Sequence, residues 1–344
     1  MKVLVLGLGL QGKAVVHDLE HSPLITEVLV ADVNADQAQQ YIRTQKYRKT
    51  RFMYLDASQS EVLTRLVSTS GVNLVICMLP PEFGFTVAQA AVQTKIPFVS
   101  SSYTGKVVEL AKRAERFGVT ILPEMGLDPG IDLVLCRLAV EEFDEVHGLY
   151  SYGGGIPEPI CANDNPLHYK ITWTFEGVLK AYQRPARILK DGKEQAIAAN
   201  DIFRAESIHQ IAIPELGELE AYPNGDAIHY IERFGLQDHI RDMGRFALRW
   251  PGHCQFWRTM VDLGFFEDTP RQFLIKHLTP RLQFRADERD VVILRIQARG
   301  LKNGRKMRVM YDLLDYRDLQ TGLFAMNRTV GFTVSIAAQM ILAG

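Results

Sequence analysis

The chain has 344 residues, more than one ordinary domain holds, so its length predicts two domains. Hydrophobic residues make up 47% of the sequence, charged residues make up 23%, and the formal net charge is −1, a composition typical of a globular protein with a sizeable core. Because this balance gives no electrostatic footprint for nucleic acid or an anionic membrane, we expect neither as a partner and expect a small-molecule ligand.

The first third of the chain alternates short apolar runs with amphipathic segments. The apolar runs, which we predict to be strands, are Val3–Leu6, Glu27–Ala31, Arg51–Leu55, Leu74–Met78, Pro97–Ser100 and Thr120–Leu122. The predicted helices between them are Gln11–Glu20, Ala35–Arg43, Ser60–Val67, Phe83–Thr94 and Gly105–Phe117. Runs that are apolar throughout are typical of parallel strands buried on both faces. The pattern therefore predicts an α/β fold of the Rossmann type, with a doubly wound parallel sheet.

After Gly126 the pattern changes to that of a second, α+β domain. A hairpin is predicted from Val291–Arg299 and Lys306–Leu314, because Asn303-Gly304 suits a type I′ turn. The last helix, Thr329–Leu342, is apolar nearly all round, so we expect it to be buried. The predicted domains are residues 1–127 for dinucleotide binding, 128–327 for substrate binding and dimerisation, and 328–344 as a helix that returns to the first domain.

The first predicted strand ends in a GxGxxG motif, Gly7-Leu8-Gly9-Leu10-Gln11-Gly12, and a predicted helix follows. In such a motif Gly7 permits the tight turn, Gly9 lets the backbone approach a pyrophosphate, and Gly12 lets the helix pack closely on the strand. The helix N-terminus offers free N–H groups to the phosphates. The motif predicts a dinucleotide site that includes Gly7, Gly9, Leu10, Gln11 and Gly12.

Asp32 closes the second predicted strand. A carboxylate at this position accepts hydrogen bonds from the ribose hydroxyls of NAD and repels the 2′-phosphate of NADP. The following residues, Val33 to Asp36, contain no Arg or Lys to offset that repulsion. The sequence therefore predicts NAD rather than NADP, although Asp32 can also cap the next helix.

Other contacts are expected where the later parallel strands end, because ligands bind at the carboxyl edge of such sheets. Met78, Leu79 and Pro80 follow the fourth strand and are predicted to contact the cofactor, as is Ser101 after the fifth. Ser102 and Tyr103 come next.

The four cysteines form no CxxC pair, so neither a disulfide framework nor a zinc site is expected. The first residues superficially resemble a signal peptide, but Gly7 and Gly9 interrupt the apolar run and no cleavage site follows. No apolar stretch approaches the roughly 18 residues that span a bilayer. We expect free thiols, a cytoplasmic protein, and no metal site.

Several motifs occur in an order that resembles the saccharopine dehydrogenase family, which includes saccharopine reductase and lysine 6-dehydrogenase. They are Ser102-Tyr103, Glu124 to Ile131, Tyr152 to Pro157, Asn165 to Leu167, Tyr169-Lys170, Thr172-Trp173, Glu176 to Leu179, Ala221 to Asn224 and Leu248 to His253. The resemblance implies a Rossmann domain, a substrate domain with a mixed, largely antiparallel sheet, and often a homodimer. It also implies hydride exchange at a carbon–nitrogen bond of an amino acid.

The resemblance also assigns residues, with two departures. Ser102, Tyr103 and Asp128 match positions that contact substrate and cofactor in saccharopine reductases. Gly225 stands where those enzymes have an arginine that holds a substrate carboxylate, and Ala247 stands where threonine is usual. Because glycine cannot replace a bidentate guanidinium, we expect a substrate related to saccharopine rather than saccharopine itself.

Each candidate role has an alternative in a purely structural function. Asp128 is predicted to hold or deprotonate a substrate ammonium, or else to cap a helix starting at Pro129. Glu124 is the candidate proton-handling partner, or a surface carboxylate. Tyr103 binds substrate or is a core aromatic, and Arg249 binds a substrate carboxylate or forms a structural salt bridge.

Three histidines have no role in this scheme. His253 is expected to titrate near neutrality or to cap the helix after it. His17 and His21 are expected to be solvated.

These features predict an NAD-dependent dehydrogenase acting on a C–N bond of a basic or opine-like amino acid. Two alternatives stay open. One is lysine 6-dehydrogenase proper, and the other is a non-catalytic NAD-binding module that kept the fold.

Overall fold

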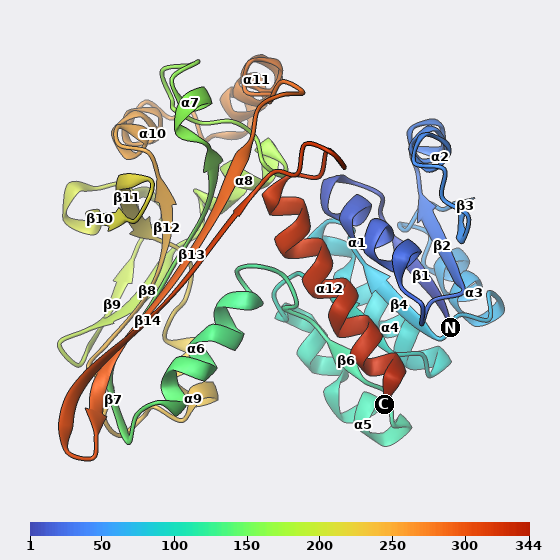
Figure 1. Ribbon diagram of the computed structural model, residues 1–344, viewed down its shortest axis with the longest axis horizontal. Helices are drawn as coiled ribbons and strands as arrows, with labels where there is room; N and C mark the ends of the chain where they lie inside the picture. The colour runs from blue at the N-terminus through green and yellow to red at the C-terminus, as the bar shows by residue number, and fades with distance from the viewer. The chain divides into compact units, whose positions relative to one another are not determined.

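The computed structural model describes residues 1–344 and consists of two compact units. Unit 1 comprises Met1–Ile131 and Asn327–Gly344, and unit 2 comprises Asp132–Met326 (Figure 1). The boundaries predicted after residues 127 and 327 lie close to these. No helix is long and apolar enough to cross a membrane.

Unit 1 is built on a six-stranded parallel sheet in the order β3-β2-β1-β4-β5-β6. Its strands are β1 (Lys2–Leu6), β2 (Glu27–Asp32), β3 (Thr50–Tyr54), β4 (Leu74–Cys77), β5 (Phe98–Ser100) and β6 (Ile121–Leu122). This order reverses between β1 and β4, as in doubly wound dinucleotide-binding folds. The predicted Rossmann fold is confirmed, and the predicted strands match the observed ones to within a residue.

The helices of unit 1 cover both faces of this sheet. They are α1 (Leu10–His21), α2 (Ala35–Thr44), α3 (Ser60–Thr69), α4 (Gly84–Thr94), α5 (Ala111–Phe117) and nearly all of α12 (Ala325–Ala343). Successive residues of β1 point to opposite faces, so Val3 and Val5 pack in one core with α1 and α12, while Leu4 and Leu6 pack in the other with α3 and α4. Burial on both faces explains why these strands are apolar throughout.

Helix α12 differs in two ways from its prediction. It begins at Ala325 rather than Thr329, and it is not buried all round, because Ile336 is 54% exposed and Met340 is 69% exposed. The buried face packs beside α1 (Figure 1), and a Cβ atom on Gly331 would lie 2.6 Å from the Cβ of Ala14. A glycine is therefore required where these two helices meet.

Unit 2 is built on an eight-stranded mixed sheet in the order β10-β11-β12-β7-β13-β14, with β8 paired to both β12 and β9. The strands are β7 (Glu145–Pro157), β8 (Ala186–Lys190), β9 (Lys193–Ile197), β10 (His209–Ile213), β11 (Gly217–Pro223), β12 (Asp242–Arg249), β13 (Asp290–Lys302) and β14 (Arg305–Tyr316). Only β7 and β12 pair in parallel, so the expected largely antiparallel sheet is confirmed.

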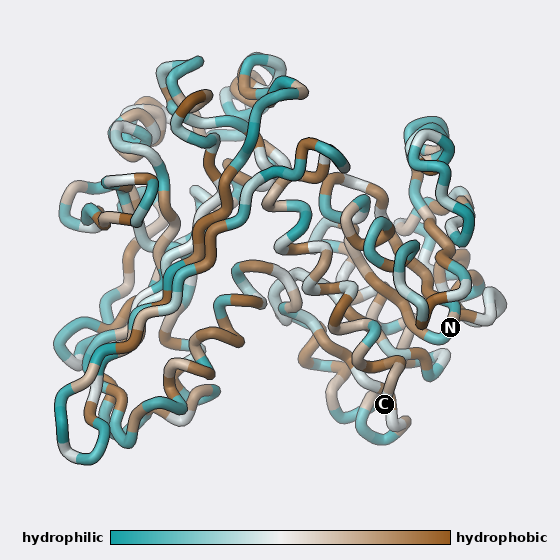
Figure 2. The backbone as a smooth tube through the Cα atoms, in the orientation of Figure 1, coloured by the Kyte–Doolittle hydropathy of each residue, from teal (hydrophilic) through white to brown (hydrophobic).

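The β13–β14 hairpin turns at Asn303-Gly304, as the sequence predicts. Both residues have positive φ values of 51° and 70°, which the type I′ turn requires. The tip of the hairpin is hydrophilic, whereas the middle of β13 is hydrophobic (Figure 2) and fully buried against β7.

The helices of unit 2 are α6 (Ile131–Glu141), which begins at the last residue of unit 1, α7 (Pro159–Ala162), α8 (Phe175–Ala181), α9 (His229–Phe234), α10 (His253–Asp262) and α11 (Asp268–Leu278). An aromatic core forms under α8, α10 and α11, where Tyr169, Tyr182 and Trp257 are fully buried. All four cysteines are buried free thiols, as expected.

Candidate functional site

The glycine-rich turn joins β1 to α1 in the geometry of a phosphate-binding loop. Gly7 has a φ of +94°, and a Cβ on Gly12 would lie 2.1 Å from the carbonyl oxygen of Gly7, so both glycines serve the close approach of helix and strand. Gly9 is different, because a Cβ there would meet no protein atom within 4 Å. Its lack of a side chain leaves open space beside the N-terminus of α1, where no side chain caps the free N–H groups. This space fits the pyrophosphate of a dinucleotide.

Asp32 ends β2 next to this turn. Its Oδ2 accepts a hydrogen bond of 2.7 Å from the backbone N–H of Leu8, and its Oδ1 accepts one of 2.8 Å from that of Asn34. The carboxylate is thus held between the phosphate turn and the start of α2, without an ion pair. Each oxygen keeps a lone pair for a ribose hydroxyl.

The loops after β5 and β6 run side by side in unit 1. The backbone N–H of Glu124 donates to the carbonyl of Ser102 at 3.0 Å, and that of Met125 donates to the carbonyl of Ser100 at 3.0 Å. The structure thereby brings together the segments that carry Ser101, Ser102 and Glu124. The loop after β4 also joins this edge, because the N–H of Met78 donates to Leu6 at 2.8 Å.

The structure corrects three of the alternatives for the unit 1 candidates. Glu124 is buried, and its Oε1 accepts hydrogen bonds from the N–H and hydroxyl of Thr104 at 2.9 and 2.6 Å, so it is not a surface carboxylate. Tyr103 is 37% exposed and therefore not a core aromatic. Asp128 does not cap a helix starting at Pro129, because α6 begins at Ile131.

Arg249 differs from the other buried cations of unit 2 in its partners. Four Lys and Arg side chains are buried there, and three of them contact a carboxylate at 2.6 Å. These pairs are Lys170–Glu288, Arg245–Asp132 and Arg295–Asp312. Arg249 has no ion pair, because its hydrogen bonds go to the carbonyl of Leu248 at 2.7 Å and the hydroxyl of Tyr182 at 3.4 Å. The expected alternative of a structural salt bridge is wrong.

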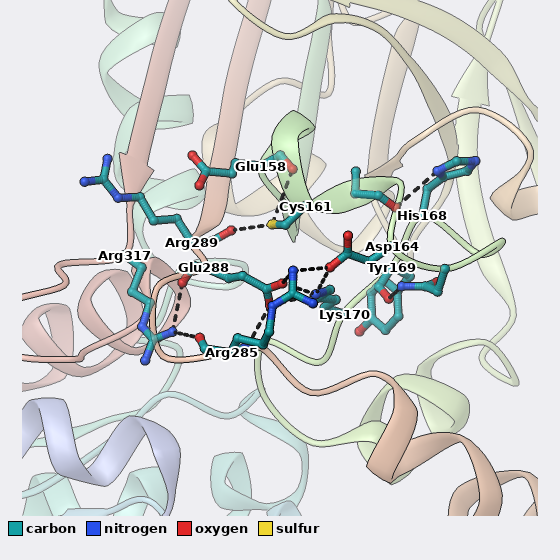
Figure 3. A network of polar contacts seen from close by, with 12 residues as sticks. Glu158, Cys161, Asp164, His168, Tyr169, Lys170, Arg285, Glu288, Arg289 and Arg317 are labelled. Carbon is teal, nitrogen blue, oxygen red and sulfur yellow. Dashed lines mark hydrogen bonds and ion pairs between the residues drawn. The ribbon is translucent and has the colours of Figure 1, made fainter.

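The Lys170 ammonium lies at the centre of a polar network that the sequence did not reveal (Figure 3). It donates to both oxygens of Glu288 at 2.6 Å and to Asp164 at 2.9 Å, and Arg285 bridges the same two carboxylates. Arg317 donates to the backbone carbonyls of Arg285 and Glu288 at 2.8 Å. These contacts tie the segment that carries Tyr169 to the chain just before β13. The Tyr169-Lys170 motif was the only sequence signal for them.

Of the two expected departures from the family pattern, Gly225 lies just after β11 and Ala247 lies on the neighbouring strand β12. Gly225 follows β11 with a φ of +75°, and Ala247 is buried in β12. The cation beside Gly225 is Arg187, which is ion-paired to Asp226 at 3.0 Å and to Glu194 at 2.7 Å. The cation at this turn is therefore already neutralised by two carboxylates.

One histidine prediction is wrong. His253 is fully buried, and burial followed by the charge of Arg249 holds its pKa well below the usual value, so it does not titrate near neutrality. His17 is half-buried and its Nδ1 lies 3.1 Å from the hydroxyl of Tyr47, whereas His21 is exposed as expected. No group of three or more potential metal ligands comes together in the chain.

Comparison with protein families identifies the class to which this fold and site belong. The saccharopine dehydrogenase NADP binding domain matches residues 3–122, and the saccharopine dehydrogenase C-terminal domain matches residues 126–344. The chain belongs to the saccharopine dehydrogenase family, as the motifs predicted.

Individual relatives agree with this assignment. The chain is 30% identical to saccharopine dehydrogenase [NADP(+), L-glutamate-forming] of Saccharomyces cerevisiae over 80% of its own length and 60% of the yeast protein. It is 34% identical to alpha-aminoadipic semialdehyde synthase of Arabidopsis thaliana over 64% of its length and 21% of that protein. The chain thus spans between a fifth and three fifths of the length of these relatives.

The solved structure of apo saccharopine dehydrogenase (L-Glu forming) from Saccharomyces cerevisiae has the same fold. It superposes with a TM-score of 0.86 and 24% identity, covering 100% of this chain and 91% of the yeast chain.

Proposed function

We propose that this chain is a nicotinamide-dependent oxidoreductase that transfers hydride at a C–N bond of a basic or opine-like amino acid. The observation that carries the proposal is the buried guanidinium of Arg249, which lacks a carboxylate partner. The guanidinium carbon lies 5.5 and 5.9 Å from the ring centroids of Tyr169 and Tyr222, which offset only part of the cost of burying a charge without a carboxylate, so the protein has a use for this cation. A planar guanidinium can bind a substrate carboxylate through two parallel N–H···O bonds.

The nucleotide site of unit 1 supports the redox part of the proposal. The open space at Gly9 and the uncapped N-terminus of α1 fit a pyrophosphate. When bound, the nicotinamide nucleotide accepts or donates the hydride. We propose NAD as the nucleotide, because Asp32 offers two carboxylate oxygens to a ribose and has no neighbouring cation for a 2′-phosphate. The family description and the yeast relative's name carry NADP, so Asp32 is the residue on which this choice depends.

The remaining candidates are given roles that the chemistry requires. Transfer at a C–N bond needs an amine that loses its proton and a pocket from which water is excluded. We propose that Asp128 holds the substrate ammonium and that Glu124, fixed by Thr104, assists proton transfer. Ser102 and Tyr103 then contact the substrate, while Met78, Leu79, Pro80 and Ser101 line the cofactor. A homodimer in the cytoplasm belongs to the same proposal.

Gly225 favours lysine 6-dehydrogenase activity as a second candidate function. Saccharopine carries the two carboxylates of its glutamate part and needs more than one cation to bind them. Arg187, beside Gly225, is already paired with two carboxylates. Lysine carries one carboxylate, which Arg249 alone can satisfy.

The test is NADH or NADPH formation by the purified protein at mildly alkaline pH. The panel contains lysine, saccharopine, ornithine and small opines, each with NAD and with NADP. Turnover of one amino acid with NAD supports the proposal, and lysine turnover selects the second candidate. Tight NAD binding without turnover of any member would instead support a non-catalytic module.

Variants test the nucleotide site and the role of Arg249 separately. Gly9→Asp should abolish nucleotide binding, because its carboxylate occupies the space for the phosphates. Arg249→Met should raise the KM for the amino acid by about 100-fold, the loss expected for a buried charge-assisted pair. Arg258→Met is the matched control, since Arg258 pairs with Asp262 on the surface of α10. An unchanged KM in Arg249→Met contradicts the carboxylate role.

A further inference from the structure

Arg249 is fixed by a hydrogen bond to a tyrosine rather than to an acid. Its Nε lies 3.4 Å from the hydroxyl oxygen of Tyr182, and its Nη1 lies 2.7 Å from the carbonyl of Leu248. A guanidinium carries five N–H donors, so most of them remain for a ligand. Because the guanidinium can only donate, the Tyr182 oxygen is the acceptor in this contact.

The proton of the Tyr182 hydroxyl must therefore go to another acceptor. The Nε2 of His253 lies 2.8 Å from that oxygen, and both side chains are fully buried. An imidazole accepts only when it is neutral, and burial together with the Arg249 charge keeps the pKa of His253 well below its usual value. The two hydrogen bonds thus run in one direction: Arg249 N–H donates to the Tyr182 oxygen, and the Tyr182 O–H donates to His253 Nε2.

The imidazole is itself held by the fold. His253 begins α10 directly after Gly252, whose φ is +92°. The carboxylate of Glu220 on β11 accepts hydrogen bonds from the N–H groups of Gly252 and Cys254 at 2.8 and 2.9 Å, which fixes the turn. The rings of Tyr169 and Trp257 pack around the imidazole, with their centroids 5.4 and 6.1 Å from the centroid of the imidazole ring. After burial itself, the charge of Arg249 is what lowers the pKa of this imidazole.

We propose that Tyr182 and His253 are positioning residues that orient the Arg249 guanidinium for a substrate carboxylate. This inference rests on the proposed function. A neutral tyrosine–histidine pair orients the arginine without neutralising it, whereas an aspartate in the same place would compete with the ligand. The arrangement keeps the guanidinium both rigid and free to bind an anion.

The main variants are Tyr182→Phe, which removes both hydrogen bonds of this series, and His253→Leu, which removes only the bond between Tyr182 and His253. Each should raise the KM for the amino acid that the panel identifies by about 10-fold, while kcat changes less than about 2-fold, because the guanidinium loses its orientation outside the reacting centre. The KM of the double variant should rise no more than that of Tyr182→Phe, since the two hydrogen bonds act as a unit. His253→Gln, whose amide oxygen can accept, should recover most of the affinity.

Tyr152→Phe is the matched control. The Tyr152 hydroxyl also lies against a histidine, at 3.2 Å from the Nε2 of His209, and the neighbouring Arg295 is already paired with Asp312 at 2.6 Å. It should leave KM unchanged. An equal rise of KM in Tyr152→Phe, or a fall of kcat in Tyr182→Phe at constant KM, would assign Tyr182 a general structural role and overturn the inference.

A second measurement does not depend on turnover. In ¹⁵N NMR spectra of the full chain, His253 should remain neutral with Nε2 unprotonated between about pH 5 and 8, and Tyr182→Phe should shift the Nε2 resonance. A proton on Nε2, or titration in this range, overturns the inference. If the spectra are as expected but calorimetry detects no amino acid binding, the proposed function fails and the inference fails with it. Turnover with an unchanged KM in Tyr182→Phe defeats the inference alone.

Discussion

The carboxylate of Asp290, the first residue of β13, accepts a hydrogen bond of 2.8 Å from the backbone N–H of Ala325, where α12 begins. Its second oxygen accepts one of 3.1 Å from the next N–H, that of Met326. Asp290 therefore caps a helix that lies 35 residues further along the chain, although it is fully buried. Burial outweighs these two bonds and the charge of Arg317, and raises the pKa of Asp290 from 3.8 to about 6.

This raised pKa predicts a specific pH dependence of stability. The folded chain binds the Asp290 proton more tightly than the unfolded chain, so this residue's contribution to the free energy of unfolding falls as pH rises from about 4 to about 6. A shift of about two pKa units corresponds to about 3 kcal/mol. Because other carboxyl groups titrate in the same range, the quantity to measure is the difference in unfolding free energy between wild type and Asp290→Asn. It should fall by about 3 kcal/mol between pH 3 and 7. A difference that does not change with pH would contradict the shift.

The Lys170–Glu288 pair should be needed for the stability of unit 2. Glu288→Gln leaves the buried ammonium with only Asp164 as a full partner, and breaking a buried pair costs about 3 kcal/mol or more. We expect this loss in urea unfolding monitored by fluorescence. Glu194→Gln is the control, because the Arg187–Glu194 pair is exposed and its loss should cost less than about 1 kcal/mol. Similar losses in both variants would show that burial does not set the strength of the pair.

Close packing of α12 on α1 gives a further prediction. A Cβ on Gly331 would approach the Ala14 Cβ to 2.6 Å and the Gln11 carbonyl oxygen to 2.8 Å, so Gly331→Ala should destabilise unit 1 by about 1–3 kcal/mol. Gly84→Ala is the control, because Gly84 begins α4 with open space around its Cβ position, where alanine should be neutral or stabilising. The midpoint of thermal unfolding measures both. Equal midpoints would mean that the two helices separate easily.

The sequence predicts what depends on local pattern and misses what depends on distant pairing. The strands of unit 1 and the Asn303-Gly304 turn follow from apolar runs and from one dipeptide, both of which are local features of the sequence. The lack of an ion pair at Arg249 does not follow from a local pattern. It is seen only when the carboxylate partners of the other buried cations of unit 2 are known. Arg245 meets Asp132 across 113 residues, and Lys170 meets Glu288 across 118. His253 was misjudged for the same reason, since its burial results from rings contributed by three separate segments.

Asp32 gives the last prediction, which concerns the choice of cofactor. Its carboxylate is fixed by the N–H groups of Leu8 and Asn34 and has no cation beside it, so a 2′-phosphate would meet a bare negative charge. Asp32→Ala should weaken NAD binding by about 10-fold, the loss of hydrogen bonds to a charged group, and should strengthen NADP binding relative to it. Dissociation constants for both nucleotides, measured by calorimetry, give the ratio directly. Asp36→Ala is the control, because Asp36 is exposed on the first turn of α2. If the NAD-to-NADP ratio is the same in wild type and Asp32→Ala, Asp32 only braces the turn, and the preference must come from residues that the sequence did not single out.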